Sequence, residues 1–66
     1  MRKNLKYARE NANMTLEKIA RKVKISERTY CRYEAGTSIP RVDVACSIAK
    51  VLNSDVEELF LDDNYT

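Results

Sequence analysis

Sixty-six residues form one domain at most, because a chain of this length has little interior to divide. Hydrophobic residues make up 44 % of the chain and charged residues 33 %, a mixture that suits a packed globule and argues against a disordered tail. The net charge is only +2, and the single Gly and single Pro argue against a turn-rich β-protein, which needs many chain-breaking residues.

The small net charge hides a strong asymmetry along the chain. Residues 1–41 hold eleven Lys or Arg and four Glu, whereas residues 42–66 hold one Lys and six acidic residues. A basic N-terminal two-thirds followed by an acidic end indicates a surface that meets a polyanion. An ordinary distribution of solvated charges explains the same counts equally well.

The sequence gives little support to metal, disulfide or membrane chemistry. Cys31 and Cys46 each stand in a helical pattern without a second ligand-type residue at metal spacing, and there is no His. We expect no secretory segment before the domain, and therefore no disulfide. The longest apolar stretches are far shorter than a membrane span. We expect a reduced, cytoplasmic protein without a metal or other cofactor and without a small-molecule ligand.

The first part of the chain predicts two short helices. Leu5, Ala8 and Ala12 form a narrow apolar stripe on a helix over residues 2–11. Thr15 is the expected N-cap of a second helix over residues 16–22. Apolar residues at helical spacing form one face of this second helix: Leu16, Ile19, Ala20 and Val23.

Only a short turn, which includes Lys24, Ile25 and Ser26, separates the third helix from the second. Ser26 is a second expected N-cap, the helix covers residues 27–35, and Gly36 can adopt the left-handed conformation that ends it. Two helices joined in this way are typical of a helix-turn-helix, here over about residues 16–35. Many small helical bundles contain similarly tight helix pairs, so the spacing alone leaves both interpretations open.

Two further helices complete the pattern. After a loop that ends at Pro40, a fourth helix is expected over residues 41–52. Its expected apolar face consists of Val42, Ala45, Ile48, Ala49 and Leu52. A short fifth helix over residues 56–61 follows a Ser54 or Asp55 cap, and residues 62–66 form a polar tail. The expected fold class is therefore all-α with five helices.

The third helix has two different sides. At 100° per residue, Tyr30, Tyr33 and Glu34 share the side that is expected to face the core. The opposite side carries Arg28 and Arg32 one turn apart, between small residues that keep this side slim. A slim helix side with paired arginines fits the DNA major groove.

These side chains match the hydrogen-bonding edges of bases. An arginine can donate two hydrogen bonds to guanine O6 and N7, Glu27 can accept one from cytosine N4, and Thr29 can contact a thymine methyl or a phosphate. The predicted base-reading residues are Glu27, Arg28, Thr29 and Arg32. An ordinary solvated helix also accommodates two exposed arginines, and the helix macrodipole already favours Glu27 in the first turn.

Two charges are expected on the inner faces of the bundle. Arg9 lies four residues after Leu5 and so points inward from the first helix, whereas Glu34 points inward from the third. Burial of either charge without a partner costs several kcal/mol. We therefore expect Arg9 and Glu34 to form a structural ion pair that ties these helices together.

Several stretches, taken together, resemble the Cro and repressor helix-turn-helix family, also called the XRE family. They are MTLEKIA at residues 14–20, ISERTY at 25–30, YEAG at 33–36, Pro40, IAKVL at 48–52 and VEELF at 56–60. The resemblance covers about Leu5 to Phe60 and implies a five-helix, lambda-repressor-like DNA-binding domain whose third helix enters the major groove. The Arg9 and Glu34 positions match an inward pair of phage repressors.

The resemblance also implies phosphate contacts. They would come from the start of the second helix and from the loop after the third: Thr15, Lys18, Thr37, Ser38 and Arg41. The family often has Gln at the first turn of the second helix, where its side chain contacts a phosphate. This chain has Leu16 there, so that contact is missing and Leu16 is expected in the core or in an interface.

As a function, the resemblance implies a transcriptional regulator, in the first place a repressor, that binds an inverted-repeat operator on double-stranded DNA as a homodimer. The expected dimer surface is the C-terminal helix and tail, residues 55–66. Its expected interface residues are Val56, Leu59, Phe60 and Leu61. Leu59 and Phe60 can instead complete the core of the domain itself.

Two alternatives remain open at this point. The first is a regulator that controls a mobile element, a restriction-modification system or a toxin pair. Such a protein would bind DNA in the same way and would differ mainly in its DNA target. A small protein-interaction adaptor would use the same fold without base readout, and its third helix should then carry aromatic and aliphatic anchors rather than Arg28 and Arg32. Catalysis has no plausible residues in this chain, so we do not expect an enzyme.

Overall fold

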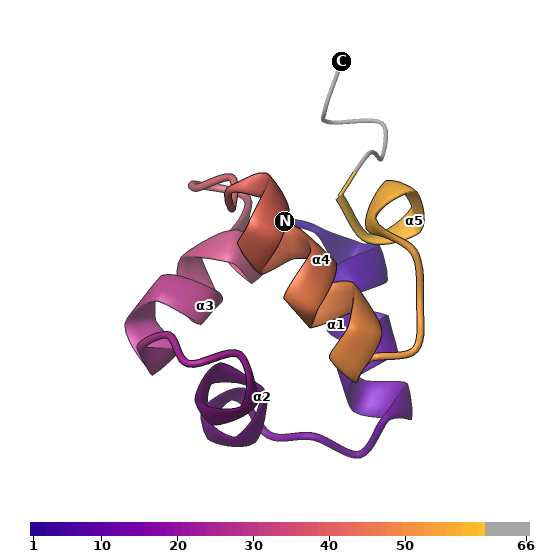
Figure 1. Cartoon of the computed structure of the whole chain (residues 1–66), viewed down its shortest axis with the longest axis horizontal. Helices are drawn as coiled ribbons and strands as arrows, with labels where there is room; N and C mark the ends of the chain where they lie inside the picture. The colour runs from indigo at the N-terminus through magenta and orange to yellow at the C-terminus, as the bar shows by residue number, and fades with distance from the viewer. Residues whose placement is uncertain (61–66) are drawn as a thin grey trace.

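The computed structural model describes residues 1–60, which form five α-helices (Figure 1). The helices are α1 (Lys3–Asn11), α2 (Leu16–Lys22), α3 (Glu27–Ala35), α4 (Val42–Val51) and α5 (Val56–Phe60). Residues 1–60 contain no β-strand, so the predicted all-α class with five helices is confirmed. The bounds of α2 and α3 agree with the prediction, α1 and α4 are one or two residues shorter than expected, and the predicted end of α5 lies outside the described residues.

Each helix contributes one large, fully buried side chain to a single core. These residues are Leu5 from α1, Ile19 from α2, Tyr30 from α3, Ile48 from α4 and Leu59 from α5. Full burial of one such side chain stabilises the fold by about 1.5–3 kcal/mol. Helices α2 and α3 pack against each other on one side of the molecule, while α5 packs on α1 and α4 (Figure 1).

The ends of α2 and α3 follow the expected capping chemistry. The Thr15 hydroxyl accepts a hydrogen bond from the Lys18 amide at 3.1 Å, and the Ser26 hydroxyl accepts one from the Thr29 amide at 3.1 Å. Gly36 has φ +84°, the left-handed conformation that ends α3. These short-range hydrogen bonds explain why both helices begin where the sequence predicts.

Replacement of Gly36 by Ala is expected to lower the free energy of unfolding by about 1–2 kcal/mol, because an L-residue with a Cβ is strained at this φ. The Cβ itself would lie 3.5 Å from the Met1 nitrogen, an ordinary contact, so strain rather than collision causes the loss. Urea denaturation measures the change. Gly36→Asn is the control and should lose less, because Asn adopts the left-handed region at Asn13 and Asn53.

The structure shows how far two sets of apolar side chains are exposed. Val42 is 80 % exposed, because it is the first residue of α4 and lies at the edge of the face that Ala45 and Ile48 bury. Leu59 and Phe60 are 1 % and 2 % exposed, because α5 turns both side chains toward α1 and α4.

Leu59 and Phe60 therefore complete the core of the domain, which is the alternative that the sequence left open for them. Val56 is half-buried against the same core. The predicted interface residue Leu61 and the tail that follows lie outside the described residues. Within residues 1–60, the helices are too short and too polar to cross a membrane.

Candidate nucleic-acid interface

Helices α2 and α3 form a tight unit joined by residues 23–26. In the turn, Lys24 adopts φ +61° and the Ile25 amide donates a hydrogen bond to the Ala20 carbonyl at 3.0 Å. Ile19 and Ala20 bury the inner side of α2. Because the turn is hydrogen-bonded and α2 is anchored in the core, α3 has a fixed orientation.

The two sides of α3 differ as the helical spacing predicts. Tyr30, Tyr33 and Glu34 are buried, whereas Arg28 and Arg32 are exposed on the outer side. Neither arginine forms an ion pair within residues 1–60. Both guanidinium groups are therefore available to an external acceptor.

The two other predicted base-reading residues flank this pair. Glu27 is exposed in the first turn of α3, and Thr29 is half-buried. The Thr29 hydroxyl oxygen accepts a hydrogen bond from the Ser26 hydroxyl at 2.7 Å, which leaves the Thr29 hydroxyl hydrogen free to donate. Thr29 is thus held at the helix start with one donor available.

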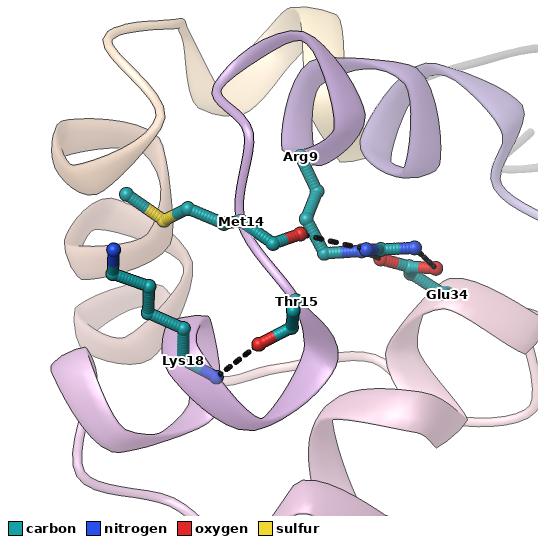
Figure 2. A network of polar contacts seen from close by, with 5 residues as sticks. All are labelled: Arg9, Met14, Thr15, Lys18 and Glu34. Atoms are coloured by element: carbon teal, nitrogen blue, oxygen red, sulfur yellow. Dashed lines mark hydrogen bonds and ion pairs between the residues drawn. The ribbon is translucent and has the colours of Figure 1, made fainter.

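The predicted phosphate-contacting residues lie at both ends of the α2–α3 unit. At the start of α2, Thr15 and Lys18 are exposed, and the Thr15 hydroxyl is occupied as an acceptor by the cap of the helix (Figure 2). After α3, Thr37 and Arg41 are exposed and Ser38 is half-buried. The Thr37 hydroxyl donates to the Arg32 carbonyl at 3.3 Å.

Arg41 has a partner of its own. Its Nε lies 3.6 Å from Asp43 Oδ1, but both side chains are largely exposed. A solvated ion pair of this kind is worth about 0–1 kcal/mol, so it leaves Arg41 free to exchange Asp43 for a phosphate.

Arg9 and Glu34 lie in direct contact (Figure 2). Arg9 Nε donates to Glu34 Oε2 at 2.6 Å and Nη2 donates to Oε1 at 3.4 Å, while Nη1 donates to the Met14 carbonyl at 2.8 Å. The side chains are 12 % and 9 % exposed. The hydrogen bond to Glu34 raises the pKa of Arg9 above its ordinary value. One guanidinium therefore joins α1, the start of α2 and the inner side of α3.

Arg2 is a buried basic residue that the sequence analysis does not single out. Its Nη1 donates to the Tyr33 carbonyl at 2.6 Å and to the Ser38 carbonyl at 2.8 Å. Its guanidinium carbon lies 5.7 Å from the centroid of the Phe60 ring, within the range of a cation–π contact. One feature of the sequence could have predicted this burial: Arg2 lies three residues before Leu5, which places it on the inner side of α1.

Tyr30 carries a buried hydroxyl that has no hydrogen-bond partner among residues 1–60. Burial raises the pKa of Tyr30 above its ordinary value, and the negative charge of nearby Glu34 raises it further. The neutral phenol is therefore the form that the folded protein holds.

Alkaline pH is expected to destabilise the fold through Tyr30. Below pH 10 the folded and unfolded chains both hold the phenol proton; above it only the unfolded chain releases the proton. The free energy of unfolding then falls by about 1.4 kcal/mol per pH unit from this residue. Urea denaturation at pH 8 and pH 11 measures the fall.

Tyr30→Phe supplies the comparison for this effect. At pH 7 it should be at least as stable as the native chain, because the lost hydroxyl is buried and has no hydrogen-bond partner within residues 1–60. At pH 11 it should be more stable than the native chain. Equal pH dependence of the two proteins contradicts the prediction.

Comparison with known proteins gives a consistent result. The helix-turn-helix family model matches residues 5–59, which include α2, α3 and α4 and most of α1 and α5. An uncharacterized HTH-type transcriptional regulator of Archaeoglobus fulgidus is 35 % identical over 63 residues, which cover 96 % of this chain and 89 % of that protein. A protein of the same description from Methanocaldococcus jannaschii is 34 % identical over 61 residues, or 92 % of each chain. No solved structure matches.

Proposed function

Because the chain belongs to the helix-turn-helix family of DNA-binding transcriptional regulators, we propose that α3 enters the major groove and that Arg28 and Arg32 read bases there. The observation that carries this proposal is the contrast between the two sides of α3. The inner side is buried, and the outer side presents two arginines without an ion-pair partner in residues 1–60. Glu27 and Thr29 stand beside them and extend the reading surface.

Phosphate contacts on both sides of α3 complete the interface. Thr15 and Lys18 would hold one phosphate at the start of α2, together with the amide groups that a helix N-terminus presents. Thr37, Ser38 and Arg41 would hold another after α3. Contacts of this kind set the register of α3 along the groove and make the affinity depend on salt.

We further propose that a homodimer binds an inverted repeat and represses transcription. One domain reads about half an operator, and a two-fold dimer doubles the contact. The exposed apolar side chains beside the phosphate loop, Ile39 at 61 % and Val42 at 80 %, are the surface that a second copy would bury.

In vitro selection from random duplex DNA at near-physiological salt tests base reading. The native protein is expected to enrich an inverted repeat, and Arg28→Ala/Arg32→Ala should not. The matched control is Arg21→Ala/Lys50→Ala, which removes the same charge from exposed positions outside the proposed interface and should still enrich the repeat. No enrichment by the native protein would favour a protein-interaction adaptor.

Two measurements test the dimer and its effect. Sedimentation equilibrium is expected to show a reversible dimer for the native chain and a monomer for Val42→Glu, with Val56→Glu as the α5 comparison. If only Val56→Glu dissociates the dimer, the dimer interface lies on α5 instead.

A purified transcription reaction tests the effect on transcription. The protein should reduce the amount of transcript only when the selected site overlaps the promoter, whereas an increase in transcript would mean activation.

A further inference from the structure

The strongest unexplained feature is the burial of Arg2 beside a surface proposed to bind DNA. Most basic residues of the N-terminal two-thirds are exposed, but Arg2 is only 5 % exposed. Its guanidinium is occupied by two carbonyl groups and by the Phe60 ring. Arg2 therefore cannot reach DNA itself, and its positive charge acts inside the protein.

The two carbonyls belong to different segments. Tyr33 lies in the last turn of α3, where carbonyl groups lack the full set of helix partners and the macrodipole favours a positive charge. Ser38 lies in the loop between α3 and α4. The backbone amide of Arg2 also donates to the Glu34 carbonyl at 2.8 Å. A single residue thus fastens the end of α3 to the loop that follows it.

Within residues 1–60, few other hydrogen bonds hold this loop. The Thr37 amide and hydroxyl both donate to the Arg32 carbonyl, at 3.1 and 3.3 Å, and both reach only the first loop residue. Ile39 is largely exposed. Between Thr37 and the buried Pro40, the Arg2–Ser38 hydrogen bond is therefore the main tie to α3.

We propose that Arg2 is a positioning residue for DNA binding: it sets the distance between the base-reading side of α3 and the phosphate-contacting loop at Thr37, Ser38 and Arg41. This inference rests on the proposed function. When α3 lies in the groove, the Arg2 hydrogen bonds hold the loop where its donors meet a phosphate. Without them, α3 still reaches the bases but the loop no longer makes its phosphate contact.

The test uses the native protein, Arg2→Met and Arg2→Lys on the selected operator, with binding measured across a series of salt concentrations. Arg2→Met keeps an apolar chain over Phe60 but removes both hydrogen bonds. If one phosphate contact is lost per protomer, the slope of log K against log salt becomes shallower by about 2 per dimer. Arg2→Lys should restore part of the slope, since an ammonium can still donate to the carbonyls.

Two further variants separate positioning from stability and charge. Lys3→Met removes one positive charge from an exposed neighbouring position and should leave the slope as in the native protein. Arg41→Ala should make the slope shallower as Arg2→Met does, and combining the two should add little. The preference for the operator over one altered at the bases read by α3 should persist in Arg2→Met.

The possible results decide between distinct conclusions. If Arg2→Met, corrected for its folded fraction by circular dichroism, keeps the native slope, Arg2 is only a stabilising residue and the inference is overturned. If Arg2→Met does not fold, Arg2→Gln carries the same test, because its side chain is too short to bridge the Tyr33 and Ser38 carbonyls, and a native slope there overturns the inference as well. If the native protein shows no sequence preference, the proposed base reading by α3 is wrong, and the inference about Arg2, which rests on it, is overturned as well.

Discussion

Replacing Glu34 by Ala is expected to lower the free energy of unfolding by about 3–5 kcal/mol. The substitution leaves the Arg9 guanidinium in a site where it is 12 % exposed, with the Met14 carbonyl as its remaining partner. A domain of this size is stable by only about 3–10 kcal/mol, so this loss removes a large part of its stability. Thermal and urea denaturation followed by circular dichroism measure the loss.

The exposed pair Glu17–Arg21 is a matched control for this loss. Its atoms are 3.8 Å apart and its side chains are largely solvated, so Glu17→Ala should change the stability by less than about 1 kcal/mol. Replacing both Arg9 and Glu34 with apolar residues should cost less than Glu34→Ala alone, because no unpaired charge remains. An unchanged melting curve for Glu34→Ala would show that the pair contributes nothing to the fold.

The second large effect concerns DNA binding. Arg28→Ala/Arg32→Ala is expected to weaken binding to the selected operator at least about 30-fold, since each bidentate contact to a base is worth about 1–3 kcal/mol. Binding to unrelated duplex should weaken much less, because the phosphate contacts remain. Fluorescence anisotropy with operator and unrelated DNA at one fixed salt concentration measures both affinities.

The specificity ratio is the informative quantity in this experiment. Arg21→Ala/Lys50→Ala should lower both affinities slightly through charge and keep the ratio of the native protein. If Arg28→Ala/Arg32→Ala also keeps that ratio, the two arginines do not read bases. The single variants then assign each arginine to a base, because each should relax the preference at one position of the half-site only.

Interactions within a few residues of one another are the part of this protein that the sequence determined by itself. Thr15 and Ser26 cap helices through amides three residues later, and Gly36 ends α3 through its own backbone conformation. The inner side of α3 also followed from the sequence, because helical spacing alone places Tyr30 and Tyr33 together.

The candidate reading surface follows from the same periodicity, since the side opposite a buried face is exposed wherever no other element covers it. The spacing of Arg28 and Arg32 therefore predicted their exposure. The contact of Arg9 with Glu34 was predictable for another reason. Two opposite charges on inner faces have few alternatives to meeting each other, because burial of a lone charge is so costly.

Only the tertiary structure decided which apolar and basic residues the neighbouring helices cover. Val42 belongs to the apolar pattern of α4 but is exposed, whereas Leu59 and Phe60 are taken into the core by α1 and α4 rather than left for a partner. Arg2 is the clearest case, because both carbonyls that it binds are more than thirty residues away along the chain. Helical periodicity states which residues share a face; what covers that face depends on how separate helices pack, and no local pattern contains that information.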